Sequence, residues 1–288
     1  MLHMHHTARA AVRMIAAVGI LSAISTCAAA QSNTGDSGAL VSLEWLHSRL
    51  SDARVVLFDV SVMRQTYDAG HIPGARFLDH AVTAGANHEM ATPSELASRL
   101  GEAGARDDAR IVLYGDHPMA TGWMYMAFVA AGHGDHVSVL DGNLRAWRAA
   151  GYAVSTDAAS GAGKLTAKTS GPPPIVDGPW VHDHLKDAAV RLFDVRPEDE
   201  WSKGMIPGAV RFGWQDLYAD LDRARFKSPS EIRRLFEDAG LREGQTAVTY
   251  CAVGMRASLA YFAARAAGIP ARVYLGSWAD WSTRYAAR

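Results

Sequence analysis

The sequence predicts an α/β protein with two tandem domains, each a parallel sheet with helices on both faces. Three observations support this fold class. A length of 288 residues corresponds to about two domains, the second half of the chain repeats motifs of the first, and short apolar runs alternate with helical patterns in both halves. The composition is 49% hydrophobic and 20% charged, so the chain can bury a core.

The internal repeat indicates the domain organisation. Motifs recur in the same order at offsets of 134 to 136 residues, which indicates duplicated domains and not a solenoid. We expect domains at residues 37–154 and 175–288, joined by a linker at Ser155–Pro174 that is flexible at first and then stiffened by three prolines. The paired segments are Leu57–Val60 with Leu192–Val195, Ile72–Ala75 with Ile206–Ala209, and Pro93–Leu96 with Pro229–Ile232.

Each copy predicts the same series of elements. In the first copy, the β-branched and apolar run Arg54–Val60 is typical of a buried strand, and Ser94–Ala103 has the spacing of a helix that Gly104 ends. A strand at Ile111–Tyr114, an apolar helix at Gly122–Ala131 and a strand at Val137–Leu140 follow. The second copy repeats the series at Val190–Val195, Glu231–Ala239, Ala247–Tyr250, Ala257–Ala267 and Ala271–Leu275.

Residues 1–30 have the three-part pattern of a secretory signal peptide. Arg9 and Arg13 precede the apolar run Met14–Ile24, which has 11 residues, and a membrane span needs about 20. Ala28–Ala30 then forms an A-x-A-like cleavage site. We therefore expect an exported, periplasmic protein with no stable membrane span.

A cysteine in the leader leaves a second possibility open. Ile24–Cys27 resembles a bacterial lipobox, so the alternative to soluble export is a lipoprotein anchored through Cys27. Thr26 is bulky for the position before a lipid-modified cysteine, which favours removal of the whole leader.

Charge and cysteine content exclude several classes of protein. The chain has 29 Lys and Arg against 30 Asp and Glu, a net charge of −1 that becomes −3 when the leader is removed. This balance argues against binding nucleic acid through a strongly basic face. Two cysteines exclude a disulfide-stapled scaffold and a four-cysteine zinc site. In the mature chain Cys251 is alone, so it is either an inert buried residue or a reactive thiol.

The segment around Cys251 favours a reactive thiol. Cys251 directly follows a predicted strand and precedes a helix, so it lies at the carboxyl edge of the sheet, where ligands bind in folds of this kind. Backbone N–H groups of Ala252–Met255 can converge there, with Gly254 supplying backbone freedom and the helix its positive end. Arg256 stands at the helix start. All of these features favour a thiolate and an anionic substrate.

The first copy serves as an internal control for this interpretation. Gly115 aligns with Cys251, Ala120 with Arg256, and Ser61 with Arg196, the arginine that follows Asp194-Val195. The nucleophile and both candidate anion-binding arginines are therefore missing together, whereas scaffold motifs are retained. We expect the second domain to be catalytic and the first to be a non-catalytic helper that walls the site.

The chain resembles the rhodanese family and, within it, the tandem-domain sulfurtransferases. The resemblance rests on Tyr250–Ser258, on Gly276–Trp281 and on Gly70–Ala75, and it covers roughly Leu40–Arg284. It implies that Cys251 takes a sulfane sulfur from a small anionic donor, becomes a persulfide, and passes the sulfur to cyanide or a thiol, including a protein thiol. It also implies that no metal or organic cofactor is needed.

The candidate site follows from the motif and the resemblance together. The catalytic residue is Cys251, and Asp194 and Trp278 are expected to support the site structurally. The residues expected to bind the substrate are Arg196, Arg256, Ala252, Val253, Gly254 and Met255.

The sequence leaves the donor open between thiosulfate, which is favoured, and 3-mercaptopyruvate. Ala252 and Val253 occupy positions that are often basic in thiosulfate enzymes, but the terminal Arg256 is nearer to the thiosulfate pattern. The loop also differs from the Cys-Gly-Ser/Thr-Gly-Val-Thr loop common in mercaptopyruvate enzymes. Met205 replaces the usual histidine of the second Gly-x-Ile-Pro-Gly-Ala motif, whereas His71 keeps it in the first.

Two other functions compete with sulfur transfer. Phosphatases and arsenate reductases of the same fold have five residues between Cys and Arg, but four lie between Cys251 and Arg256, which gives a tighter cradle. The other alternative is a non-enzymatic sulfur carrier or binding module, which would also keep Cys251 to bear a persulfide.

Overall fold

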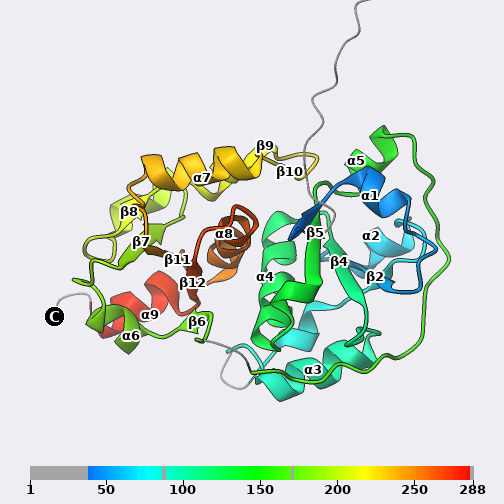
Figure 1. Ribbon diagram of the computed structural model, residues 1–288, viewed down its shortest axis with the longest axis horizontal. Coiled ribbons are helices and arrows are strands. Elements are labelled where there is room, and N and C mark those ends of the chain that lie inside the picture. The colour runs from blue at the N-terminus through cyan, green and yellow to red at the C-terminus, as the bar shows by residue number, and fades with distance from the viewer. Residues whose placement is uncertain (1–37, 86–88, 170–171, 286–288) are drawn as a thin grey trace, which may run out of the picture. The chain divides into compact units, whose positions relative to one another are not determined.

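The computed structural model describes residues 38–85, 89–169 and 172–285, and every structural statement below refers to them (Figure 1). The predicted signal peptide and Cys27 lie outside the described residues. The chain forms two five-stranded sheets, one in each copy of the repeat, together with a two-stranded hairpin.

The first sheet has the strand order β1-β5-β4-β2-β3, and all of its strand pairs are parallel. The three strands expected in this copy are confirmed within one or two residues. The two-residue edge strands β1 and β3 are too short to give a periodic sequence signal. The strands are β1 (Leu40–Val41), β2 (Val55–Asp59), β3 (Arg76–Phe77), β4 (Arg110–Tyr114) and β5 (Val137–Leu140).

Helices connect these strands, and both predicted helices are present. Helix α3 (Pro93–Glu102) starts at a capping box in which Thr92 and Glu95 satisfy each other's backbone N–H groups. Helix α4 (Pro118–Ala130) begins four residues before the predicted start, because Pro118 fits the first position of a helix. The shorter helices are α1 (Leu43–His47), α2 (Arg64–Asp68), η1 (His80–Thr83), η3 (Gly134–His136) and α5 (Leu144–Ala149).

The second sheet repeats the first, with the strand order β6-β12-β11-β7-β8 and parallel pairing throughout. Its central strands carry the residues of interest, because β7 ends at Asp194 opposite Tyr250 at the end of β11. The strands are β6 (Ile175–Val176), β7 (Val190–Asp194), β8 (Val210–Arg211), β11 (Thr246–Tyr250) and β12 (Ala271–Tyr274). The helices are α6 (Gly178–Asp183), η4 (Glu198–Lys203), η5 (Trp214–Leu217), α7 (Pro229–Asp238), α8 (Met255–Ala266) and α9 (Ser277–Arg284).

Both faces of each sheet are buried, which confirms the predicted fold class. Neighbouring residues of β2 point to opposite faces, so Leu57 belongs to one hydrophobic cluster and Phe58 to another. Leu192 and Phe193 of β7 do the same in the second copy. Phe58 and Phe193 belong to one continuous core, which therefore spans both copies.

The two copies meet along the equivalent helices α4 and α8, which lie side by side in Figure 1. A glycine permits this contact, because a Cβ on Gly122 would lie 2.6 Å from the Leu259 Cα atom. The rings of Tyr125 and Phe262 pack edge to face nearby, with their centroids 4.9 Å apart.

A second contact joins the copies through the hairpin of β9 (Tyr218–Asp220) and β10 (Arg225–Phe226). The Phe226 N–H donates to Asp141 Oδ1 at 2.8 Å, and Arg225 forms an ion pair with the same carboxylate at 3.2 Å. Asp141 follows β5, so the hairpin of the second copy reaches the carboxyl edge of the first sheet.

The segment expected to be a linker differs from its prediction in one respect. Its composition predicts a flexible first half, but residues 155–168 are hydrogen-bonded to the first copy at several points. The His71 and Ser155 backbones pair, the Gly163 N–H donates to the Gly101 carbonyl at 2.8 Å, and Leu165 is buried. Hydrogen bonds to the first copy therefore hold residues 155–168 in place, although their local sequence predicts no regular structure.

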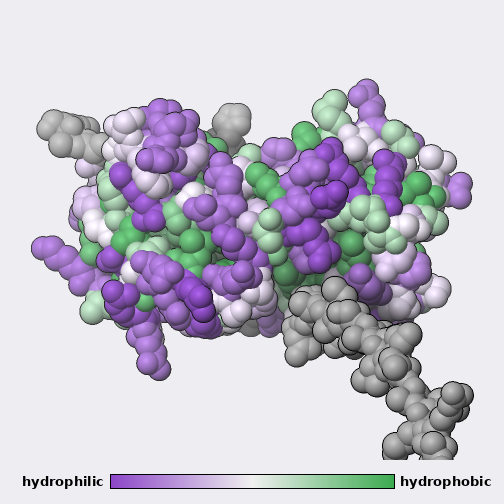
Figure 2. Space-filling view, turned by 90° about the horizontal axis from the view of Figure 1, so that it is seen from above, coloured by the Kyte–Doolittle hydropathy of each residue, from purple (hydrophilic) through white to green (hydrophobic). Residues whose placement is uncertain are grey.

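The surface carries hydrophilic and hydrophobic residues interspersed, as Figure 2 shows for one face. The large hydrophobic side chains that are exposed stand at scattered positions, namely Val62, Met63, Val154, Leu221 and Val253. In the part of the chain that the structure describes, no helix is both long and apolar enough to cross a membrane.

Candidate active site

Cys251 lies in the loop between β11 and α8, at the carboxyl edge of the second sheet, as the sequence predicts. The side chain is fully buried, and its Sγ accepts a hydrogen bond from the Gly254 N–H at 3.1 Å. The Cys251 N–H donates to Ser277 Oγ at 3.1 Å, and that oxygen lies 4.0 Å from Sγ. The thiol therefore accepts a backbone hydrogen bond, and the Cys251 backbone is held by Ser277.

Gly254 turns the chain from the loop into helix α8. Its φ of 96° is in the left-handed region, and it forms the N-cap of the helix. A Cβ on this residue would also lie 2.8 Å from the Leu275 carbonyl oxygen. Both observations require glycine, and the turn they permit places the Gly254 N–H on the sulfur.

The start of α9 is bonded to the same loop. The Trp278 N–H donates to the Cys251 carbonyl and the Ala279 N–H to the Ala252 carbonyl, both at 3.0 Å. Val253 is 63% exposed, so the loop presents its middle to solvent while the thiol stays covered. Among the described residues, the backbone donor on the sulfur is Gly254. Substrate binding by Ala252, Val253, Gly254 and Met255 remains a prediction.

Arg256 is in the first turn of α8, where it was expected, but its guanidinium is paired with a carboxylate. Its Nη1 and Nη2 donate to the two carboxylate oxygens of Glu200 at 2.6 and 3.0 Å. This hydrogen bond lowers the pKa of Glu200 against the opposing effect of burial. Burial alone would lower the pKa of Arg256, but Glu200 and the neighbouring Cys251 side chain raise it. Arg256 is therefore a permanent cation beside the thiol.

Arg196 is fully buried and bonded to Asp194, also through two nitrogens. Its Nε and Nη2 donate to the carboxylate at 2.8 and 2.5 Å, and Nη2 also donates to the Gly204 carbonyl. Tyr250 completes the network by donating its hydroxyl to Asp194 at 3.0 Å. The remaining nitrogen, Nη1, is buried with no hydrogen-bond partner among the described residues. Binding of an anion by that nitrogen remains a prediction.

The two residues expected to support the site structurally, Asp194 and Trp278, both contact Arg196. Asp194 holds its own loop, since it accepts the Arg196 backbone N–H at 3.2 Å in addition to the guanidinium. The Trp278 ring lies against Arg196, with the guanidinium carbon 5.1 Å from the ring centroid. Trp281 is buried in the hydrophobic core of the second copy.

Sequence reasoning missed Glu200 and Ser277. Glu200 lies in an acidic stretch without a recognisable motif, and its role depends on contact with a residue 56 positions away. Ser277 lies within a motif that the resemblance used, but nothing in that motif indicated that its hydroxyl bonds Cys251. Its φ of 53° is unusual for a residue other than glycine, and its hydroxyl also donates to the Tyr274 carbonyl at 2.9 Å.

The equivalent place in the first copy lacks this chemistry. Asp59 keeps the role of Asp194 by accepting the Ser61 N–H at 2.9 Å, but Ser61 supplies no charge. A Cβ on Gly115 would lie 3.1 Å from the Val60 carbonyl carbon, so a side chain has little room there. The first copy is therefore a scaffold without a nucleophile.

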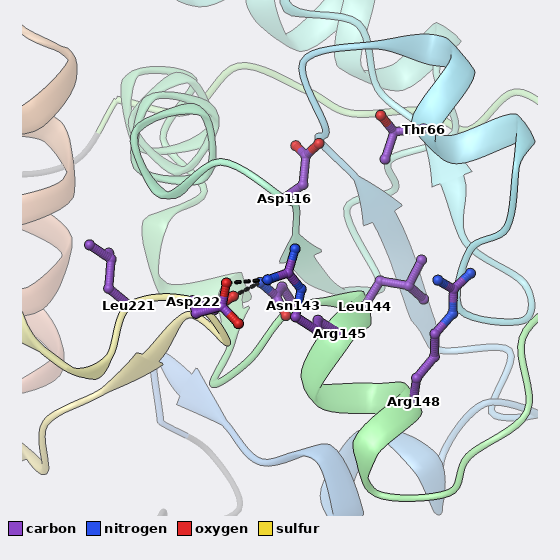
Figure 3. Close-up of a pocket in the computed structure, with 8 residues that line it drawn as sticks. All are labelled: Thr66, Asp116, Asn143, Leu144, Arg145, Arg148, Leu221 and Asp222. Atoms are coloured by element: carbon purple, nitrogen blue, oxygen red, sulfur yellow. Dashed lines mark hydrogen bonds and ion pairs between the residues drawn. The ribbon is translucent and has the colours of Figure 1, made fainter.

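A cavity of about 350 Å³ lies at this edge of the first sheet (Figure 3). Asp222 at the turn of the β9–β10 hairpin pairs with Arg145 of α5 across it. Thr66 and Asp116 of the first copy also line it, at the positions of Glu200 and Ala252 in the second.

The first copy does not supply the hydrogen-bond partners of the site. In the described ranges, the partners of Cys251, Arg196 and Arg256 all belong to the second copy. The expectation that the first domain walls the site is not supported by these contacts. The first copy packs against the second through α4 and α8. Within the same ranges, no group of three or more His, Cys, Asp or Glu side chains is arranged to hold a metal ion.

Two parallel sheets, with a buried thiol at the carboxyl edge of the second, define a tandem α/β protein in which one of the two domains carries a cysteine. Comparison with known proteins gives the family. The model of the rhodanese-like domain matches the chain twice, at residues 42–150 and 177–284. The chain belongs to the rhodanese family, and within it to the tandem-domain sulfurtransferases.

Individual relatives agree with this assignment. A probable 3-mercaptopyruvate sulfurtransferase of Pseudomonas aeruginosa is 31% identical over 284 residues, covering 86% of this chain and 96% of the relative. A thiosulfate sulfurtransferase of the same organism is 28% identical, covering 82% and 91%. The crystal structure of the 3-mercaptopyruvate sulfotransferase SseA from Escherichia coli has the same fold, with a TM-score of 0.74 at 22% identity over 84% of this chain and 99% of that one. The relatives favour sulfur transfer over phosphate or arsenate chemistry.

Proposed function

We propose that this enzyme moves a sulfane sulfur from a small anionic donor to cyanide or a thiol through a persulfide on Cys251. Thiosulfate is the favoured donor and 3-mercaptopyruvate the next. The observation that carries the proposal is the environment of one sulfur atom. Cys251 Sγ lies at the carboxyl edge of the catalytic sheet, accepts the Gly254 N–H, and has the cation of Arg256 beside it.

With thiosulfate, the first step forms one S–S bond and breaks another. The Cys251 thiolate attacks the outer sulfur of thiosulfate, and sulfite leaves with the electron pair of the broken bond. Arg256 and the buried Nη1 of Arg196 are the charged donors available to the sulfonate oxygens and to the departing sulfite. This step needs no external oxidant or reductant.

The second step returns the enzyme to its starting state. The acceptor attacks the terminal sulfur of the persulfide, and the Cys251 thiolate leaves. With cyanide the product is thiocyanate, and with a thiol it is a new persulfide. Val253, two residues after Cys251, is exposed, so a small thiol or a protein thiol can approach the loop at this point.

Steady-state turnover with thiosulfate and with 3-mercaptopyruvate, measured side by side with cyanide as acceptor, tests the proposal. We expect repeated turnover with both donors and a higher kcat/KM for thiosulfate. A preference for 3-mercaptopyruvate would overturn the donor assignment alone. A stable persulfide that forms once and does not turn over would show a sulfur carrier in place of an enzyme.

We further propose that the protein is exported to the periplasm and loses residues 1–30. The support is the sequence pattern of the leader, which places Arg9 and Arg13 before a short apolar run. The intact mass of protein purified from its native host tests this, with a chain starting at Gln31 expected. A chain that starts at Cys27 and carries acyl groups would show a lipoprotein.

A further inference from the structure

Glu200, the carboxylate paired with Arg256, is a charged residue of the site to which the proposed reaction assigns no role. Glu200 belongs to η4 and Arg256 to α8, so the pair connects two separate elements of the second copy. Both side chains are largely enclosed, with 14% of Arg256 and 21% of Glu200 exposed. An ion pair so placed is held more firmly than one on the open surface.

The geometry of this pair fixes the orientation of the guanidinium as well as its position. Two parallel N–H···O bonds define a plane, unlike the single contact that a lysine would make. Arginine has five N–H donors, and Glu200 takes two of them. The others keep a fixed direction beside Cys251, and a donor anion can use them without first ordering the side chain.

The first copy supports a joint role for the two residues. With the offset that aligns Gly70 with Gly204, Thr66 stands where Glu200 does, and Ala120 stands where Arg256 does. The copy that lacks the nucleophile therefore lacks both members of the pair.

We propose that Glu200 is a positioning residue, which holds the guanidinium of Arg256 in the orientation that binds the sulfur donor. This inference rests on the proposed sulfur transfer from an anionic donor. Glu200 also has a competing effect on anion binding, because its negative charge offsets the positive charge of Arg256. If charge alone mattered, removing the carboxylate would strengthen the binding of an anion.

Steady-state kinetics of Glu200→Gln with thiosulfate separates the two roles by sign. The variant keeps the shape of the side chain, removes its charge and breaks the two-point pairing. We expect the KM for thiosulfate to rise about fivefold or more, with kcat within about threefold of the wild type. An unchanged or lower KM would overturn the proposal.

Two controls limit the interpretation. Asp199→Asn removes the same charge from the exposed neighbouring position, and its KM is expected to change less than twofold. In an Arg256→Ala background, Glu200→Gln is expected to raise KM less than twofold, because there is no guanidinium left to orient. The same rise in both backgrounds would show a structural role of Glu200 and overturn the proposal.

An alkylation experiment keeps the inference separate from the proposed function. Iodoacetate is anionic, whereas iodoacetamide is neutral and of similar size. The experiment measures the rate at which each reagent labels Cys251, from the mass of the modified peptide. We expect the ratio of iodoacetate to iodoacetamide rates to fall about threefold or more in Glu200→Gln, and an unchanged or higher ratio would contradict the positioning role. If the wild type showed no turnover with any donor while the ratio still fell in Glu200→Gln, the proposed sulfur transfer would be refuted and the positioning role would stand.

Discussion

Cys251 is the side chain on which the proposed chemistry depends, and replacing it separates packing from reactivity. Cys251→Ser changes one atom, and the hydroxyl can accept the Gly254 N–H that the sulfur accepts, so we expect normal folding. Oxygen cannot form a persulfide, so sulfur transfer is lost. Mass spectrometry after incubation with thiosulfate should show one added sulfur atom on the wild type, removable by cyanide, and none on the variant. Turnover by Cys251→Ser would refute the mechanism.

The first copy supplies a control for that experiment. Adding Gly115→Cys to Cys251→Ser should not restore activity. The new Cβ would lie 3.1 Å from Val60 atoms, and Ala120 and Ser61 stand where the second copy has its arginines.

Arg256 and Arg196 both carry charge at the site, but the structure predicts different consequences of losing them. A charge-assisted hydrogen bond contributes about 1.5–3 kcal/mol, so each alanine variant should lower kcat/KM for thiosulfate about tenfold or more. Arg196→Ala should also cost about 3–5 kcal/mol of stability, because Asp194 stays buried without its partner. Arg256→Ala leaves the partly exposed Glu200 behind and should cost much less.

Kinetics together with urea denaturation of both variants checks this prediction. Unchanged kinetics in both would mean that the anion is held by backbone N–H groups alone. Equal losses of stability would contradict the difference in burial between the two pairs.

The turn that connects β11 to α8 is the element that places the thiol, and Gly254 is its critical residue. Gly254→Ala should destabilise the protein by roughly 1–3 kcal/mol, because φ is 96° and the new Cβ would meet the Leu275 carbonyl. It should also slow persulfide formation, since the Gly254 N–H bonds the sulfur.

Gly244→Ala is the matched control for this turn. Its φ of 79° is also positive, but a Cβ there would meet nothing within 4 Å. Denaturation and the rate of persulfide formation should therefore show a smaller loss of stability and unchanged chemistry. Equal effects on the chemistry of the two variants would contradict the role of the turn.

At the scale of the whole molecule, the α4–α8 contact joins the two copies, and we expect it to couple the first copy to the site in the second. Gly122→Ala in α4 would bring a Cβ within 2.6 Å of the Leu259 Cα atom in α8. Overpacking of this kind costs about 1–3 kcal/mol. Because α8 begins beside Cys251 and carries Arg256, we expect a lower melting temperature together with lower kcat/KM. Thermal denaturation and donor kinetics check this, and a variant as stable and active as the wild type would contradict the coupling.

Local sequence patterns predicted most of the elements, because strands of four or five buried residues and helices of ten or more give a clear periodicity. Comparing the two copies then indicated Cys251 and two arginines as candidate site residues, since residues missing together from one copy stand out against a retained scaffold. No such signal marked very short strands such as β1 and β6. Residues 155–168, which are held by hydrogen bonds to the first copy, gave none either.

The amino-acid sequence by itself determined the fold class, the duplication and the family, and it predicted Cys251 as the reactive thiol. The tertiary structure decided what each charged group meets. Arg196 with Asp194 is a local pair, whereas Arg256 with Glu200, Ser277 with Cys251, and Gly122 with Leu259 join residues far apart in the chain. Periodicity reports which way a residue faces within its own element. The partner of a charge depends on how the elements pack, which no local pattern specifies.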